Sequence, residues 1–264
     1  MNIKNTPIIA VLSMVIFASS CKKNNDSGSD DLSSSMLIKR IAYSDTTGQH
    51  YGTSESFQYD LEGRISQMLY DMPQWMDSVL HIFKYYPSKV NVEYFYTNHF
   101  KGGRYTYYLN ADGLAVADTQ ITYSQKGDST ISFTDTFIYD QNGYMVEKKT
   151  FIDGDTSRWI SENYQIVNGN IVSTVFDRAD WGSPLTETYE YYPNSLNTLG
   201  NANTGRIFLG KSSTNLMKSS LTQYDPPKTA KYTYFMDSRN RVVLEFIRGD
   251  GYMIGSENQM CTYY

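Results

Sequence analysis

The sequence predicts an all-β fold: a curled or barrel-like antiparallel meander of β-hairpins in two related halves, soluble rather than membrane-spanning. Three observations predict this class. Apolar and polar residues alternate along most of the chain after residue 35, and hardly any segment has helical periodicity. Turn signals separate these segments at short intervals. Tyrosine is abundant, with 24 residues, and suits half-buried strands because its ring packs while its hydroxyl reaches water.

Residues 1–20 are expected to be a signal peptide. Lys4 supplies a positive start, an apolar run follows over residues 7–18, and small residues lead into Cys21. The run is too short to cross a bilayer as a helix, which takes about 20 residues. The position of Cys21 resembles a bacterial lipobox, so we expect Cys21 to be lipidated and to anchor the protein to the membrane. The alternative is an ordinary signal peptide followed by a chance cysteine.

Residues 21–35 are expected to form a lipidated cysteine and a flexible tether, followed by a single β domain over residues 36–264. Leu32 is the only apolar residue between Lys22 and Ser35, so this stretch has too little apolar surface to fold. Lys23 and the scattered aspartates after it resemble the surface-export signal of Bacteroidetes lipoproteins. The expected location is the outer membrane, with the cell surface favoured over the periplasmic face.

The charge balance argues against a nucleic-acid partner. The formal net charge is −5, and loss of Lys4 with the signal makes it −6, whereas nucleic-acid affinity comes largely from basic contacts to phosphate. Besides Cys21 the only thiol is Cys261, so lipidation would leave no intramolecular disulfide. We expect Cys261 to be a small buried strand residue.

Five segments share one hairpin design, in which an aromatic or apolar residue and Asp or Asn precede a short spacer, Gly or Asn, and a new strand. The expected turns are at residues 61–63, at Asp112-Gly113, at Asn142-Gly143 as a two-residue hairpin, at Asn168-Gly169, and at Asn240. Asn240 replaces glycine in the fifth, and Asn tolerates positive φ better than most residues.

A longer repeat relates the two halves. Shifted by 106 residues without a gap, Tyr59–Asn91 lies over Gln165–Asn197, matching glycines, tryptophans and a Tyr-Tyr-Pro triplet. A later match, YTYYLN with YTYFMD, has an offset of 127, so the second half carries about 21 extra residues, roughly Leu199–Ser219. Related hairpins favour a sheet that curls or closes, because an open flat sheet exposes its edges.

A membrane-spanning barrel is the alternative architecture. Segments such as VEKKTFID and TQITYSQKGDSTISF lack a clean lipid-facing apolar row of roughly ten residues. An N-terminal lipid anchor would also be redundant for such a barrel. The sequence therefore favours a lipid-tethered domain outside the bilayer.

The lipobox-like start, the Tyr-Asp-x-x-Gly-Arg hairpins and FLGKSSTNLMKS followed by YTYFMDSRNRV resemble a Bacteroidetes lipoprotein family, a domain of unknown function with a porin-like fold. The hairpin unit also resembles the YD repeat of Rhs-type proteins. The resemblance implies a highly curved antiparallel sheet and no particular activity. Asn240, in place of glycine, and the degenerate turn at residues 168–170 depart from the pattern.

GRIFLGKS, residues 205–212, matches the phosphate-binding pattern G-x-x-x-x-G-K-[ST]. A phosphate loop follows an apolar strand and opens a helix, whereas NTLGNANT precedes this match and Arg-Ile-Phe-Leu favours an extended strand. We therefore expect a strand, a turn at Gly210, and a short helix or loop, within a structural insertion and without a nucleotide.

No catalytic constellation, metal site or cofactor is predicted. His50, His81 and His99 share no metal-ligand spacing, and no G-x-S-x-G occurs. The acids at the hairpin tips fit turn capping better than calcium binding. Trp75, Trp159 and Trp181 are candidate stacking platforms for sugar rings, although Trp75 and Trp181, as repeat equivalents, could instead pack the same core position.

The sequence favours a lipid-anchored cell-envelope protein that acts as a non-enzymatic binding or interaction module for a glycan or another envelope protein. It leans against an enzyme. Two alternatives stay open: a carbohydrate-active hydrolase, whose two carboxylates cannot be selected among 28 acids, and a structural envelope protein.

Overall fold

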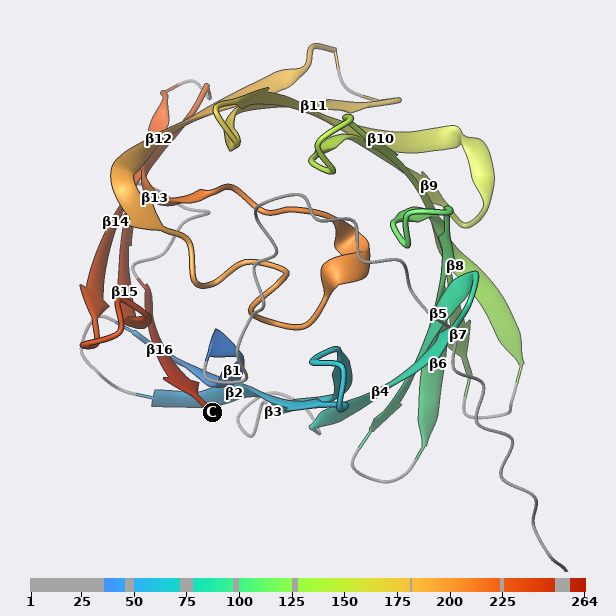
Figure 1. Ribbon diagram of the computed structural model, residues 1–264. Coiled ribbons are helices and arrows are strands. Elements are labelled where there is room, and N and C mark those ends of the chain that lie inside the picture. The colour runs from blue at the N-terminus through green and yellow to red at the C-terminus, as the bar shows by residue number, and fades with distance from the viewer. Residues whose placement is uncertain are drawn as a thin grey trace, which may run out of the picture. The chain divides into compact units, whose positions relative to one another are not determined.

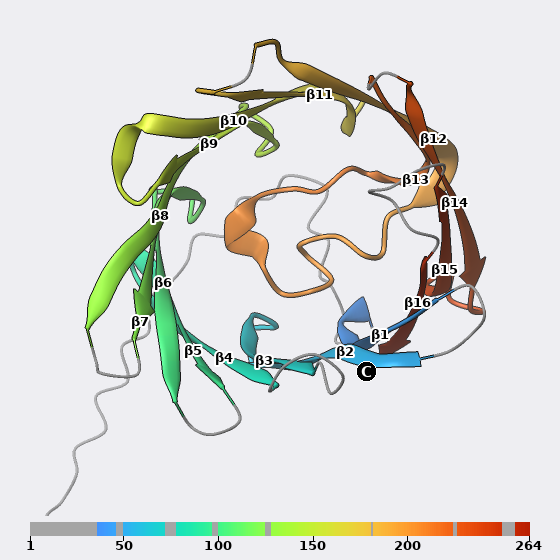
Figure 2. The same cartoon turned by 180° about the vertical axis from the view of Figure 1, so that it is seen from behind.

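The computed structural model describes residues 36–45, 50–71, 78–96, 100–124, 128–180, 182–223, 226–249 and 257–264. In these residues the chain forms one sheet of sixteen antiparallel strands in sequence order, closed into a barrel. Figure 1 looks along the barrel, and the segment between β12 and β13 lies inside the ring. Figure 2, from behind, shows the same segment inside the wall. Within these ranges no helix is long and apolar enough to cross a membrane.

The strands are β1 (Ile38–Asp45), β2 (His50–Tyr59), β3 (Ile65–Asp71), β4 (Val79–Tyr86), β5 (Lys89–Tyr96), β6 (Lys101–Leu109), β7 (Ala115–Tyr123), β8 (Ser129–Tyr139), β9 (Met145–Ile152), β10 (Asp155–Val167), β11 (Asn170–Arg178), β12 (Leu185–Leu196), β13 (Asn215–Thr222), β14 (Lys228–Met236), β15 (Val242–Gly249) and β16 (Glu257–Tyr263). A 3-10 turn, η2 (Ile207–Leu209), lies between β12 and β13.

Closure corrects the fold class expected from the sequence. The expected curled or barrel-like meander is a fully closed barrel, because β1 pairs with β16 and Ile41 lies opposite Cys261. The expectation of a soluble rather than membrane-spanning domain no longer follows. A closed barrel leaves no strand edge unpaired, and it is one of the two architectures that can cross a bilayer. The predictions of an all-β meander and of a buried Cys261, which is 2% exposed, are confirmed.

Side chains of Asp or Asn build the tight turns. Asp60 Oδ1 accepts the amides of Glu62 and Arg64, and its Oδ2 accepts the Arg64 guanidinium at 2.8 Å. Asn110, Asp140 and Asp237 accept two turn amides in the same way. The residue three positions after each of these four has positive φ: Gly63, Gly113, Gly143 and Asn240.

These turns confirm one expectation and correct another. Asn240, at φ 57°, does take the place of glycine. Asn142-Gly143 is not a two-residue hairpin: only Gly143 has positive φ, and the turn runs from Asp140 to Tyr144. Asn168-Gly169 does form a two-residue connection with both φ positive.

At the start of four strands the register of the strand pairing shifts. One residue at each shift does not use its backbone amide and carbonyl for a bond to a neighbouring strand. A tyrosine hydroxyl from the following strand donates to the carbonyl of that residue at 2.5–2.9 Å: Tyr59 to Ile38, Tyr85 to Ile65, Tyr191 to Ile171 and Tyr263 to Val242. We call these four residues the bulge residues.

The amides of the same four bulge residues donate to residues 197–214, which we call the insert. The acceptors are Asn203 O for Ile38, Gly205 O for Ile65, Ser213 Oγ for Ile171 and Thr198 Oγ1 for Val242, at 2.9–3.2 Å. A buried amide without an acceptor is costly, so the insert completes the backbone bonding at one end of the barrel. The lumen of a barrel this size is wide enough for such a segment.

The insert contains the phosphate-loop match, and its conformation corrects the expected one. Ile207–Leu209 is a 3-10 turn rather than an extended strand, and Asn215 opens strand β13 rather than a helix or loop. The turn at Gly210 is confirmed, with φ 77°. Phe208, 3% exposed, explains the conformation: it packs with Val90, Val92, Ala115 and Phe137 of the wall.

Candidate functional site

Strand alternation divides the barrel wall into an inward face, which carries tyrosines and acids, and an outward face. The inward positions follow from contacts with the insert: Glu55 lies 3.9 Å from Arg206, and Tyr107 packs on Phe208 with a ring separation of 4.9 Å. By the same alternation the described inward acids are Glu55, Asp118, Asp135, Glu162, Glu187 and Glu245.

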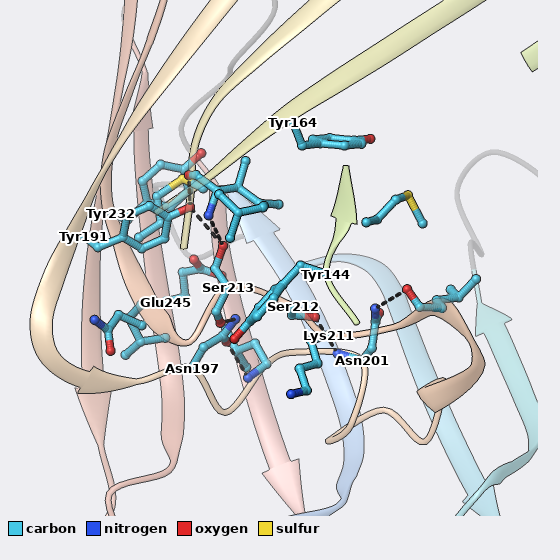
Figure 3. Close-up of a pocket in the computed structure, with 18 of the residues that line it drawn as sticks. Tyr144, Tyr164, Tyr191, Asn197, Asn201, Lys211, Ser212, Ser213, Tyr232 and Glu245 are labelled. Atoms are coloured by element: carbon cyan, nitrogen blue, oxygen red, sulfur yellow. Dashed lines mark hydrogen bonds between the residues drawn. The ribbon is translucent and has the colours of Figure 1, made fainter. Parts of the chain in front are cut away.

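A cavity of about 490 Å³ lies between the insert and the wall formed by β9–β16. Its aromatic lining consists of Tyr144, Tyr164, Tyr191, Tyr232 and Tyr234, and its polar lining includes Asn197, Asn201, Ser212, Ser213, Glu245 and Gln259. Figure 3 shows Tyr191 and Tyr232 near one another on the wall, with Tyr164 standing apart and Asn201 and Ser212 on the insert.

The insert side of the cavity is held rigidly by its own amide groups. Asn201 Nδ2 donates to Gly210 O at 3.0 Å, and its backbone amide donates to Ser212 Oγ at 2.8 Å. Asn197 Nδ2 donates to Ser213 O at 3.0 Å. Tyr191 fixes the wall side, since its hydroxyl lies 3.0 Å from Ser213 Oγ. A cavity with preformed walls orders little on binding a ligand, which favours affinity.

Tyrosine hydroxyls are paired with glutamates along the inward face. Tyr164 donates to Glu162 at 2.6 Å, Tyr189 to Glu187 at 3.1 Å and Tyr43 to Glu55 at 3.1 Å. Burial and then the bond to Glu162 raise the pKa of Tyr164 above its ordinary range. Burial and the charge of Glu245 do the same to the pKa of Tyr234. Because these hydroxyls donate their protons to glutamates, they offer a ligand their remaining oxygen lone pairs and their aromatic faces.

An aromatic stack covers the inward face of β4–β6. The His81 ring lies 5.8 Å from the Tyr94 ring and 6.4 Å from the Tyr105 ring, nearly parallel to both. Gly102 and Gly103 make room for it, because a Cβ on either would come within 2.6 Å of the Tyr94 ring. Burial, then the charge of Arg206, lowers the pKa of His81 to about 4, so this histidine is neutral at pH 7.

A pair of aspartates lies on the neighbouring strands. Asp118 of β7 and Asp135 of β8 are register partners on the inward face. Lys148 of β9 lies 3.5 Å from Asp135 Oδ2 and 3.9 Å from Glu162 Oε1. Burial, then the charge of Asp135, raises the pKa of Asp118 to about 7. The two carboxyl groups therefore differ in their environments.

The residues proposed from the sequence lie elsewhere. Trp159 is on the outward face of β10, opposite Phe151, with Lys149 Nζ 4.7 Å from its ring centroid. Trp75, Trp181, His99 and Cys21 lie outside the described residues, as do residues 1–20 and the 21–35 tether. His50 belongs to β2, but its side chain is not described.

The residues that line the lumen carry a signal that sequence reasoning missed. In two of the hairpins a tyrosine immediately precedes the turn aspartate, as Tyr59 and Tyr139 do, and it faces inward. Counting back by two from Tyr59 along β2 gives Phe57 and Glu55, which are also inward. The tyrosine before the turn aspartate therefore indicates which residues of its strand face the lumen.

Five of the eight backbone amides in the phosphate-loop match already have acceptors within the protein. The amides of Gly205, Arg206, Leu209 and Gly210 donate to carbonyls of the insert itself, and that of Lys211 donates to Gly143 O at 2.9 Å. Among the described residues, no group of three or more His, Cys, Asp or Glu side chains is placed to hold a metal ion.

Solved structures share this architecture. A porin-like protein from Bacteroides uniformis matches with a TM-score of 0.62 and 14% identity, over 86% of this chain and 98% of that one. The barrel is porin-like in fold. A porin-like protein from Bacteroides vulgatus gives a TM-score of 0.55 at 11% identity, over 86% and 99% of the two chains. No protein-family model and no curated protein matches the sequence.

The porin-like fold implied by the sequence resemblance is thus confirmed by these neighbours. Membership in a lipoprotein family and the relation to YD repeats stay predictions. At this level of identity the likeness extends to the fold alone.

Proposed function

We propose that this chain is a lipid-anchored cell-envelope protein whose barrel binds a glycan without catalysing its conversion. The observation that carries the binding proposal is the cavity of about 490 Å³ beside the insert, with five tyrosine rings and several amide and hydroxyl groups. Sugar rings have apolar faces that pack on aromatic rings, and their hydroxyls need the kind of acceptors this wall supplies. The proposal therefore takes the lumen tyrosines, and not Trp159, as the stacking platform.

Binding is tested on the full chain by glycan-array screening followed by calorimetry with the best ligand. Tyr164→Leu removes a ring from the cavity wall, and we expect at least tenfold weaker binding. Tyr164→Phe keeps the ring and should stay within about threefold of the wild type. Tyr108→Leu is the matched control, because Tyr108 is 47% exposed on the outward face. A blank array, or equal losses for Tyr164→Leu and Tyr108→Leu, would contradict the proposal.

The envelope location rests on Cys21 and the residues before it. Incorporation of a palmitate analogue into the wild type, absent from Cys21→Ser, is the expected result. We favour the outer membrane with the barrel at the cell surface, so protease added to intact cells should remove it. Protection in intact cells and digestion after permeabilisation would assign the periplasmic face instead.

A hydrolase is the second candidate, and the Asp118–Asp135 pair is the observation that favours it. Two close carboxyl groups in unlike environments, of which Asp118 has a raised pKa, can serve as acid and base. Hydrolysis of the bound glycan, abolished by Asp118→Asn, would replace the non-enzymatic proposal. Partnership with another envelope protein, or a structural role, predicts crosslinks in cells or loss of envelope integrity on deletion, with a blank glycan array.

A further inference from the structure

Asp118 and Asp135 lie side by side on the inner wall of the barrel. They are paired in the register of β7 and β8, and both face the lumen. Cross-strand partners have Cβ atoms about 5 Å apart, so the two carboxyl groups are within reach of each other. Asp118 is only 5% exposed. Two carboxylates at this separation, one buried and the other half-buried, repel one another when both are ionised.

The neighbours of the pair are unequal. Asp135 has the Lys148 ammonium 3.5 Å from its Oδ2, which stabilises its ionised form. No basic side chain among the described residues forms an ion pair with Asp118, whose other inward neighbour is Tyr107 across the β6–β7 ladder. Tyr105 also lies on β6, and Glu162 of β10 shares Lys148 with Asp135. Of the two carboxyl groups, Asp118 is therefore the one that takes up a proton.

One atom of the pair lacks a partner. Asp135 Oδ1 is fully buried and accepts no hydrogen bond. An orphaned buried carboxylate oxygen is costly, and the group best placed to supply a donor is a protonated carboxyl on the facing residue. The O–H of Asp118 would stay covalently intact and donate to Asp135 Oδ1, which leaves one negative charge on the pair.

We propose that Asp118 and Asp135 form a shared-proton carboxyl pair, with Asp118 as the acid and Asp135 Oδ1 as the acceptor. The raised pKa of Asp118, about 7, is consistent with this geometry. Loss of the proton adds one negative charge to the lumen wall beside the aromatic stack. The inference concerns the empty protein and does not depend on the glycan proposal.

The direct test is a carboxyl-carbon NMR titration of the full chain labelled at aspartate. One aspartate should titrate near pH 7, and it should be absent from Asp118→Asn. Asp135→Asn removes the neighbouring charge, so the midpoint of Asp118 should fall by about one pH unit or more while burial keeps it above its ordinary value. Asp112→Asn, the same change at an exposed turn tip, should leave the step in place.

Two results would overturn the proposal: all aspartates titrating below about pH 5, or a step near pH 7 that persists in Asp118→Asn. His81 does not contribute to a step near pH 7 in this experiment, because its pKa lies near 4 and it carries no carboxyl carbon.

Stability gives an independent readout with a definite sign. The folded pKa of Asp118 lies above the ordinary aspartate value of 3.8, so the native state holds the proton more tightly than the unfolded chain. The resulting stabilisation is complete below about pH 4 and is lost as the pH rises to about 7. The Tm difference between wild type and Asp118→Asn should therefore fall over that range and then level off. A difference that is constant or rises would contradict the proposal.

Discussion

Segments 59–91 and 165–197 repeat one another in sequence and in bonding, yet they end differently. In both, a tyrosine on the second strand donates to the bulge carbonyl on the first: Tyr85 to Ile65 at 2.9 Å and Tyr191 to Ile171 at 2.6 Å. The two pairs are separated by the same 106 residues that the sequence repeat predicts. The repeat is therefore a structural unit as well as a sequence match.

The difference lies after the Tyr-Tyr-Pro triplet. In the first half Pro87 and Ser88 form a short turn from β4 to β5, whereas in the second half β12 continues through Pro193 to Leu196 and the insert follows. The insert then serves both halves, since its Gly205 O accepts the Ile65 amide and its Ser213 Oγ accepts the Ile171 amide. The insert of the second half thus supplies hydrogen-bond acceptors for backbone amides in both halves.

The largest effect is expected when the insert of the second half is replaced by the short turn of the first half. Replacing residues 198–213 with Pro-Ser removes the acceptors of all four bulge amides, each worth about 1–3 kcal/mol when buried. It also removes Phe208 from the core. We expect loss of cooperative thermal unfolding and fast hydrogen exchange at the bulge amides. A cooperative transition at the wild-type Tm would show that the barrel does not need the insert.

A milder test removes one anchor of the insert. Phe208→Ala should cost about 3–5 kcal/mol of unfolding free energy, because it empties a packed site in the first half of the barrel. Ile207→Ala changes the neighbouring residue, which is 52% exposed, and should stay within about 0.5 kcal/mol. Denaturant unfolding of both variants measures the difference. Equal effects would mean that Phe208 does not hold the insert.

The smallest effect is expected from removing the hydroxyl groups of Tyr85 and Tyr191, which occupy equivalent positions in the two halves. Tyr85→Phe and Tyr191→Phe should each cost about 1–2 kcal/mol, because each leaves a bulge carbonyl without its donor. Tyr191→Phe should be the more costly, since its hydroxyl also lies 3.0 Å from Ser213 Oγ. Tyr86→Phe, at a 45% exposed position, is the control. If Tyr85→Phe matched that control, the shared bond would contribute nothing to stability.

The hairpins were predictable from sequence because their causes are local. Turn aspartates, glycines and alternation act over a few residues, and Asn240 in the place of glycine follows from its tolerance of positive φ. The sequence did not decide between a curled and a closed sheet, because Ile38 pairs with Tyr263 and no local pattern encodes that contact. The 3-10 turn at Ile207–Leu209 was missed for a similar reason: Phe208 is held by strands β5–β8, far away in the sequence.

The candidate site was predictable only in its chemistry. Aromatic stacking was the expected mode of binding, and the three tryptophans were the predicted platforms. The one described tryptophan, Trp159, faces outward, whereas five tyrosines line the cavity inside the barrel. Which aspartates would meet was set by the register of β7 and β8, which composition does not reveal.

The position of the insert at the closing seam has a consequence for how the ring forms. Joining β1 to β16 brings together Ile38 and Tyr263, 225 positions apart, and contacts of such long range slow folding. The insert touches both sides of that seam: Asn203 accepts the Ile38 amide, and Thr198 Oγ1 accepts the Val242 amide and lies 3.3 Å from the Tyr263 hydroxyl. We expect strands β1 and β16 to dock on the insert first. The hydrogen bonds between these two strands would then form last, when both strands are already close together.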